Sequence, residues 1–296
     1  MKIDVHVVTL MMKEDARSAL RREARGRETE ADAGRIIVPA FTEQFRRILA
    51  ATENTSGIVW TPCVTWSRKE MESAGIFEIW GRRNARESSR DTMLNLETLA
   101  ALPHLQTGPN LRVKLLSPIH ISRARCRPID ALRVGDWAEE YLIGRAVKWA
   151  FEQRGLRGYT TRPVFGTKGR QALEDVWQIC TDRILPPTVP DPSVIEVESA
   201  FEERPWWKRR LGSLTWRPES FPSGSDFWRT AEPWGANGLP LWIVTRSVVD
   251  CFEAAGLRGW SFRPALWAGS PLHQEYLDRW TALTDALSAN PGNRLW

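Results

Sequence analysis

The sequence contains few histidines and cysteines, and those it has lie far apart. No histidine stands near a cysteine at metal-ligand spacing, and no CxxC pair occurs. This pattern argues against a structural zinc site and against a disulfide framework, and it favours buried free thiols. We therefore expect no metal and no cofactor. The four cysteines are Cys63, Cys126, Cys180 and Cys251.

Standard catalytic signatures are also missing. The chain has no HExxH, GxSxG, P-loop or Rossmann glycine motif. His6 and His120 each lie between apolar residues in strand-like segments, which is typical of core or edge positions. The paired carboxylates at 139–140 and 202–203 lie in charged segments that we expect to be exposed, and adjacent residues do not face one another on a helix or strand. We expect no catalytic residue and no enzyme activity.

Long apolar runs are absent as well. No run approaches the ~18 apolar residues of a membrane span. The first residues, 1–6, lack the basic start and the long apolar stretch of a signal peptide. The 296 residues are 42% hydrophobic, which is ample for a buried core and too much for a disordered chain. We expect a soluble cytoplasmic protein without membrane association, and length alone suggests about two domains.

The most informative feature that is present is a motif that occurs three times. Each copy has a short apolar strand-like run, a helix-like run, a glycine and then a proline five residues later. Measured at that glycine, the copies are 101 residues apart both times. Repetition at a fixed period indicates architecture before chemistry. The glycine and proline pairs are Gly57 with Pro62, Gly158 with Pro163, and Gly259 with Pro264.

The local pattern around each copy predicts a strand, a helix, a glycine turn and a second strand. Gly155 and Gly256 fit the left-handed residue that ends a helix, and Thr245 fits a helix N-cap. β-forming residues follow, and we expect Pro163 and Pro264 to limit that strand to an edge, or to mark where it bends or ends. The sequence thus predicts an α+β fold of repeated strand–helix–strand units around a mixed β-sheet.

Three successive regions are predicted from these repeats. Residues 1–110 form an N-terminal α/β region with a faint first repeat, residues 111–185 hold the second repeat, and residues 194–296 hold the third repeat and a C-terminal amphipathic helix. The proline-rich residues 181–193 are interpreted as a linker.

Tryptophan is unusually frequent, with sixteen copies. Several stand at repeat-related or apolar positions, where large aromatic residues usually fill the core. We therefore expect Trp60, Trp149, Trp242 and Trp260 to be buried.

The best candidate for a contact surface is residues 206–210, in which two aromatic residues precede three cations. Such a segment could stack bases and neutralise phosphates, or it could anchor an acidic protein partner. Alternatively, one tryptophan is buried and the cations are solvated. The net charge of +5 and the pI near 9.2 favour nucleic acid or an acidic partner weakly. The segment consists of Trp206, Trp207, Lys208, Arg209 and Arg210.

Two recurring patterns admit both a structural and a functional interpretation. The Gly-Leu-Arg-Gly tetrapeptides at 155–158 and 256–259 share the GxxG spacing of KH nucleic-acid-binding domains. β-formers and a proline follow them instead of a helix, so helix termination is favoured. Asp136 and Asp226 precede aromatic residues in the second and third copies. We interpret them as turn or capping aspartates rather than as a pair of site carboxylates.

The third copy resembles a known family. The runs at 241–246, 255–259 and 262–264, with Asp226-Phe227-Trp228 upstream, look like the closing segment of the double-CXXCG-motif immunity proteins. Those are bacterial proteins paired with swarming-associated polymorphic toxins. The resemblance covers residues 217–267 best and 127–165 as an earlier counterpart. Both CxxCG pairs are missing here, so no metal is implied, and the resemblance implies no catalytic residues.

The resemblance implies a non-enzymatic bacterial immunity protein that binds a cognate protein toxin and neutralises it by covering its active surface. A nucleic-acid-associated binding module is the first alternative, supported by the basic pI and by residues 206–210. An enzyme with no recognisable motif is the second. A neighbouring toxin gene favours the immunity protein, steep salt dependence of binding favours nucleic acid, and a pocket with converging acidic residues or histidines favours the enzyme.

Overall fold

The three repeats fold alike in the computed structural model, which describes residues 1–8, 30–32, 35–52, 58–81, 84–85, 119–121, 130–134, 140–166, 171–198, 206–232, 234, 240–289 and 293–295. In each repeat the two strands joined by the helix belong to one sheet, with one other strand between them. The repeats are β3 (Arg35–Pro39), α2 (Glu43–Ala51) and β4 (Ile58–Thr65); β9 (Glu140–Gly144), α5 (Arg145–Gln153) and β10 (Thr160–Gly166); and β16 (Trp242–Thr245), α6 (Arg246–Ala254) and β17 (Trp260–Trp267).

The strand in the middle of each repeat is antiparallel to both of its neighbours. The outer neighbour beside the strand before the helix is antiparallel, and the one beside the strand after the helix is parallel. Over these five strands the three sheets share one order, and the predicted α+β fold is confirmed. The middle strands are β1 (Lys2–Val8), β11 (Ala172–Cys180) and β5 (Ile76–Gly81). The outer strands are β2 (Glu30–Asp32), β8 (Ala131–Val134) and β15 (Phe227–Arg229) on the antiparallel side, and β18 (Asn293–Leu295), β7 (His120–Ile121) and β14 (Thr215–Trp216) on the parallel side.

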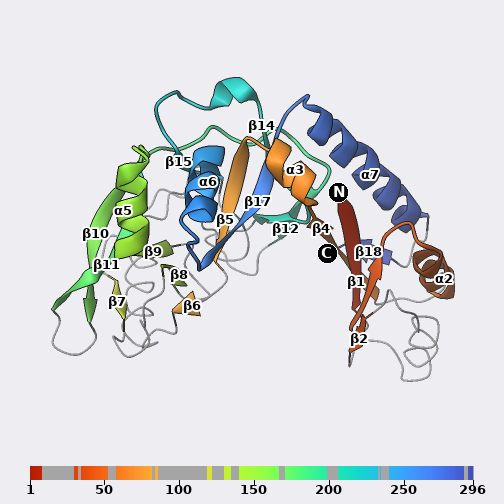
Figure 1. Ribbon diagram of the computed structural model, residues 1–296. Coiled ribbons are helices and arrows are strands. Elements are labelled where there is room, and N and C mark those ends of the chain that lie inside the picture. The colour runs from red at the N-terminus through yellow and green to blue at the C-terminus, as the bar shows by residue number, and fades with distance from the viewer. Residues whose placement is uncertain are drawn as a thin grey trace.

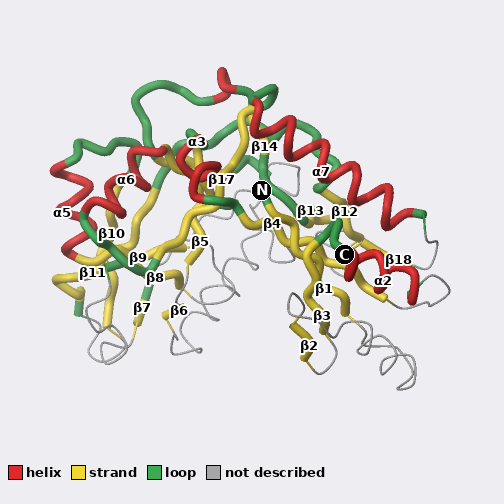
Figure 2. Tube along the Cα trace, turned by 45° about the vertical axis from the view of Figure 1, so that its right-hand side comes forward, coloured by secondary structure: helices red, strands yellow, loops and turns green. Residues whose placement is uncertain are grey.

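The remaining elements connect or cover these sheets. They are α3 (Arg68–Ser73), the paired strands β12 (Val194–Glu198) and β13 (Trp206–Arg210), a 3-10 helix (Pro218–Ser220), and α7 (Pro271–Ser288). In addition, β6 (Asn84–Ala85) pairs parallel with β8 and is a sixth strand of the second sheet. The molecule is an arch in which the second and third repeats lie at one side and the first repeat, α2 and α7 at the other (Figure 1). The turned view shows the same two sides (Figure 2).

Strands cross the boundaries of the three regions predicted from sequence. β5, from residues 1–110, is the middle strand of the third sheet, between β16 and β17. β18, from the C-terminal region, pairs with β4 of the first sheet. The middle strands of the first and second repeats come from segments next to those repeats in the sequence, whereas the middle strand of the third repeat comes from the N-terminal region. The described parts of the first and third regions therefore complete one another's sheets.

Apolar side chains form three clusters between these layers. The first lies in the first sheet beneath α2 and α7, and it includes Trp60, Tyr276 and Trp280. The second joins α5 and α6 to the second and third sheets. The third lies on the opposite face of the third sheet and includes Leu185, Trp216 and Trp228. Burial of these faces is the main force that holds the arch together.

The helix ends follow the sequence pattern closely. Gly155 and Gly256 both adopt a φ of 63°, the left-handed conformation that glycine reaches without strain. Leu156 donates its N–H to the carbonyl of Phe151, and Leu257 does the same one repeat later. These bonds close the helix C-termini as a Schellman motif does.

The prolines occupy a different place from the one expected. Pro264 lies inside β17, which has β14 on one side and β5 on the other, so it neither ends the strand nor makes it an edge. The Leu266 N–H donates to the carbonyl of Leu214, the residue just before β14, and N–H groups alternate sides along a strand. The Pro264 nitrogen, which has no hydrogen to donate, therefore faces the side of β17 on which β14 lies, but β14 pairs only with Leu266 and Trp267, so no hydrogen bond is lost at Pro264. Pro163 does mark an irregularity, because the register of β10 shifts just after it, whereas Pro62 lies within β4.

The Gly-Leu-Arg-Gly loops bind each other's repeat. The N–H of Arg157 donates to Asp226 Oδ2 at 2.9 Å, and the N–H of Arg258 donates to Asp130 Oδ2 at 2.9 Å. Backbone bonds run the other way, from Asp226 N to Arg157 O at 2.7 Å and from Ala131 N to Arg258 O at 3.0 Å. The second and third repeats are thus joined reciprocally by two equivalent contacts, which we call the aspartate latches.

The second glycine of each loop makes this contact possible. A Cβ on Gly259 would lie 1.7 Å from the carbonyl oxygen of Ala131, and a Cβ on Gly158 would lie 1.8 Å from Ser225 Oγ. Both glycines have positive φ, 110° and 89°. Helix termination therefore explains only the first glycine of each tetrapeptide, and close approach between repeats explains the second.

Asp226 is a turn aspartate, as expected, but its counterpart is not the predicted one. The equivalent latch residue in the second repeat is Asp130, whereas Asp136 lies outside the described residues. Thr245 stands at the N-cap of α6 without a capping side-chain bond, because its hydroxyl donates to Asp226 Oδ1 at 2.7 Å. The carboxylate is the stronger acceptor and holds the latch turn to the helix start.

Three of the four tryptophans expected in the core are buried, namely Trp60, Trp242 and Trp260. Trp149 is 62% exposed on α5, so that prediction was wrong. The buried face of α5 is formed by Val147, Ala150 and Phe151, and Trp149 falls on the other side of the helix.

Tyr159, beside the second-repeat latch, supports a pH prediction. Burial, with smaller contributions from Glu152 and Cys251, raises the pKa of its phenol to about 12. The unfolded chain should titrate at about 10. The stabilisation is therefore fully present below pH ~10 and is lost as the pH rises through about 12. We expect urea unfolding to show a larger loss of stability above pH ~10 for the native chain than for Tyr159→Phe. Equal losses would contradict the assignment.

Candidate functional site

The segment predicted to contact a partner forms β13, which pairs antiparallel with β12 in a separate two-stranded sheet. Lys208 stands opposite Glu196 in this register. The side chains of residues 206–210 lie outside what the structure describes, so their role in binding stays a prediction. Gly57 also lies outside the described residues, whereas Pro62 lines a cavity.

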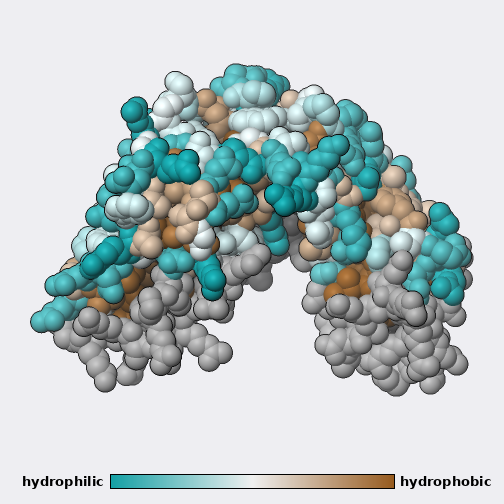
Figure 3. Space-filling view, in the orientation of Figure 1, coloured by the Kyte–Doolittle hydropathy of each residue, from teal (hydrophilic) through white to brown (hydrophobic). Residues whose placement is uncertain are grey.

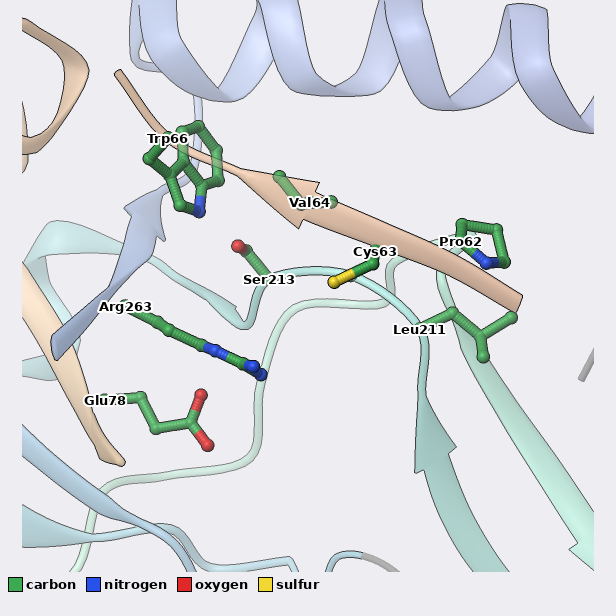
Figure 4. Close-up of a pocket in the computed structure, with 9 residues that line it drawn as sticks. Pro62, Cys63, Val64, Trp66, Glu78, Leu211, Ser213 and Arg263 are labelled. Atoms are coloured by element: carbon green, nitrogen blue, oxygen red, sulfur yellow. The ribbon is translucent and has the colours of Figure 1, made fainter. Parts of the chain in front are cut away.

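That cavity lies where the first and third sheets meet. Its volume is about 130 Å³, below the roughly 300–1,000 Å³ of sites for drug-sized ligands. It therefore suits one side chain or a few heavy atoms. Strand β4, strands β5 and β17, and the loop at 211–213 supply its walls (Figure 4). The lining residues are Pro62, Cys63, Val64, Trp66, Glu78, Leu211, Gly212, Ser213 and Arg263.

One acidic and one basic side chain lie together in this cavity. Glu78 on β5 and Arg263 on β17 are directly opposite cross-strand partners. Figure 4 shows both side chains extending into the cavity from neighbouring strands. Glu78 is only 2% exposed, whereas Arg263 is exposed. The carboxylate therefore belongs to the floor of the cavity and the guanidinium to its rim.

The Arg263 guanidinium is stacked on an indole. Its Cζ lies 3.7 Å from the centroid of the Trp80 ring, a distance at which the cation and the π-system attract each other. Trp80 is 37% exposed although it stands on the middle strand of a sheet. Ser261 Oγ donates to the Trp80 carbonyl at 2.9 Å and ties the two strands together at this point. We call Trp80, Glu78 and Arg263 the Arg263 cluster.

The strand pattern explains why the cluster is accessible. Phe77 and Ile79 of β5 point into the core beneath α5 and α6, so Ile76, Glu78 and Trp80 share the opposite face. Ile76 belongs to the third apolar cluster together with Leu185 and Leu214, whereas Trp80 at the other end of the strand is only partly covered. The space-filling view shows the arch hollowed between its two sides (Figure 3).

The loop that forms one wall of the cavity is clamped to α7. Tyr276 donates its hydroxyl to Ser193 Oγ at 2.6 Å and accepts the N–H of Ser213 at 3.1 Å. A Cβ on Gly212 would lie 1.8 Å from that hydroxyl, so the backbone approaches closely here. All three groups are buried, and the wall is therefore preorganised.

A second polar group joins the second and third sheets in the interior. Arg229 Nη1 lies 3.3 Å from Glu140 Oε1, and Gln178 donates its amide to Glu140 Oε2 at 2.9 Å. Arg229 also lies 4.9 Å above the Trp242 ring. Glu140 was expected in an exposed pair but is only 8% exposed, because β9 runs through the middle of the second sheet. This group is a structural tie between sheets.

The described residues hold neither a metal-binding cluster nor a membrane-spanning helix. Within them, no group of three or more His, Cys, Asp or Glu residues could hold a metal ion. Cys63, Cys180 and Cys251 form no disulfide with one another, and burial raises the pKa of the Cys251 thiol. No described helix combines the length and apolar character that crossing a membrane requires.

Comparison with protein-family models gives no match to the chain, and a search of curated proteins finds no relative. The resemblance to the double-CXXCG-motif immunity proteins therefore remains a proposal. Sequence reasoning missed the Arg263 cluster as a site, although one signal was present. Glu78 interrupts the apolar run 76–80, and a charge inside a buried strand is a marker of function or pairing.

Proposed function

We propose that this protein is a non-enzymatic bacterial immunity protein that binds a cognate protein toxin and neutralises it by covering its active surface. The observation that carries the proposal is the Arg263 guanidinium stacked on the exposed ring of Trp80. Tryptophan and arginine are the residues that most often dominate the binding energy of protein interfaces.

The surroundings of the cluster favour binding over chemistry. Both residues stand on strands of a five-stranded sheet, so their backbone has little conformational freedom left to lose when a partner docks. The stacked arginine has already given up much of its side-chain freedom. The adjoining cavity could accept one anchoring side chain of the partner. These are properties of a preorganised interface centre rather than of a site built for proton transfer.

Co-expression with the toxin domain encoded by a neighbouring gene tests this proposal. We expect the chain to restore growth and to bind the isolated domain directly. Trp80→Ala should weaken the dissociation constant by about 30-fold or more, as expected when an interface hot spot is removed. Trp149→Ala is the matched control, because this exposed tryptophan lies on α5, and it should leave binding unchanged.

The same assay separates the alternatives. A chain that neither rescues growth nor binds its neighbouring toxin would contradict the immunity function. Binding to nucleic acid that falls steeply with rising salt would instead support the nucleic-acid module, for which residues 206–210 and the net charge of +5 are the relevant features.

A further inference from the structure

We infer that Arg263 anchors a carboxylate of the partner, namely an aspartate or glutamate side chain that meets the guanidinium at the mouth of the cavity. The inference rests on the proposed function and specifies the chemistry that the partner presents there. It starts from an arginine that is held in place while its hydrogen-bond donors remain unused.

The unused donors follow from the contacts of Arg263. Within the part of the chain that the structure describes, its guanidinium makes no hydrogen bond and no ion pair, and its one specific contact is the Trp80 ring. A guanidinium carries five N–H donors, all directed along its plane. Stacking on the indole covers one face of the plane but leaves these edges available.

The surrounding walls decide which ligand suits the donors. A carboxylate matches the fork of a guanidinium with two parallel hydrogen bonds. Glu78 is buried and its cross-strand partner Arg263 is exposed, so a carboxylate that arrives from solvent would meet the cation before the buried acid. The cavity that Arg263 enters is lined in part by Pro62, Val64 and Leu211, which suit the methylenes of a short acidic side chain.

The charges that line the cavity also favour a protein carboxylate over the phosphate backbone of a nucleic acid as the ligand. Nucleic acid is held by rows of cations that neutralise successive phosphates, whereas this cavity has one arginine and one buried carboxylate among its lining residues. A net charge of +5 favours an acidic protein partner over a basic one. We therefore assign the site to an acidic surface of the partner protein.

The first experiment compares two substitutions at Arg263 in the full chain, with the isolated toxin domain of the neighbouring gene as the probe. We expect Arg263→Gln to raise the dissociation constant about 10–100-fold, because charged hydrogen bonds are lost. Arg263→Lys should recover only part of this loss, because an ammonium cannot form the fork. Arg145→Gln, an exposed arginine of α5, serves as the control and should have no effect. Urea unfolding verifies that each variant is folded.

The second experiment identifies the carboxylate on the partner. Each surface aspartate and glutamate of the toxin domain is changed to its amide, alone and with Arg263→Gln. One of these changes should weaken binding to the native chain yet add nothing when Arg263 is already replaced. Alkylation of Cys63, which lines the cavity, should slow in the complex, whereas alkylation of Cys180 gives the comparison within the same sample.

The outcomes distinguish this inference from the proposed function. If the native chain did not bind the toxin domain, both the carboxylate anchor and the proposed immunity function would be contradicted. Binding that is weakened by Trp80→Ala but unaffected by both Arg263 variants would leave the immunity function intact and overturn the carboxylate anchor. The anchor would also be overturned if every acidic change on the partner were additive with Arg263→Gln, or if Cys63 reacted equally fast in the complex.

Discussion

Replacing Gly259 by alanine should destabilise the fold by about 4 kcal/mol, the sum of an unfavourable backbone conformation and an overpacked contact. The new Cβ would lie 1.7 Å from the carbonyl oxygen of Ala131, which is backbone and part of a latch. Neither side can move without breaking the hydrogen bonds between Arg258 and the turn at Asp130. Urea unfolding of the purified variant measures the loss.

Gly256→Ala is the matched control, at the first residue of the same tetrapeptide. This glycine also has positive φ, but a Cβ there would meet nothing within 4 Å. We expect a loss of about 1 kcal/mol from the backbone conformation alone. Equal losses at the two positions would show that the close approach between repeats contributes nothing.

The second repeat refines this test. A Cβ on Gly158 would collide mainly with the side chain of Ser225, at 1.8 Å from its Oγ. Adding Ser225→Gly to Gly158→Ala should therefore recover part of the lost stability. No single side-chain deletion should rescue Gly259→Ala, because there the obstacle is a carbonyl group.

Removing one member of the buried ion pair should have an effect of similar size. Glu140→Ala leaves the Arg229 charge in the interior without its carboxylate, and we expect a loss of about 3–5 kcal/mol. Gln178 would also lose its acceptor. Urea unfolding of the purified variant, compared with the native chain, measures the effect.

A double substitution provides the control for this prediction. Replacing both residues, Glu140→Leu with Arg229→Met, removes the unpaired charge and fills the volume with apolar atoms. Such exchanges are often neutral or stabilising, so the double variant should be more stable than Glu140→Ala alone. If it were less stable, the geometry of the pair rather than the buried charge would dominate.

The local elements were predictable because their signals are local. Gly155 and Gly256 end helices because only glycine adopts the left-handed conformation there without strain. The strand–helix–strand order followed from periodicity, since burial of one face imposes a period on the sequence. The errors arose at contacts. Val147, Ala150 and Phe151 mark the buried face of α5 by their helical spacing, and Trp149 lies off that face, so its large apolar side chain alone gave the wrong expectation. Nothing near Pro264 in the sequence indicates which edge of β17 pairs with β14.

The candidate site was less predictable than the fold. Arg263 belongs to the repeated motif, but its meaning depends on Trp80, which is distant in sequence and reaches it only because β5 enters the third sheet. The latch aspartate of the second repeat was missed for the same reason. Asp130 can be identified by the hydrogen bond it accepts from the distant Arg258 N–H, whereas the residues next to it in the chain give no sign of this role.

The sequence by itself determined the repeated unit, its helix stops and its α+β class, because these depend on conformational preferences and on hydrophobic periodicity within about twenty residues. Only the tertiary structure decided which strand completes each sheet, how the second and third repeats join, and where Glu78, Trp80 and Arg263 meet. A local sequence pattern shows that a segment prefers to be a strand, but it does not show which strand lies beside it. The neighbour is decided by how side chains from distant parts of the chain pack and are buried together.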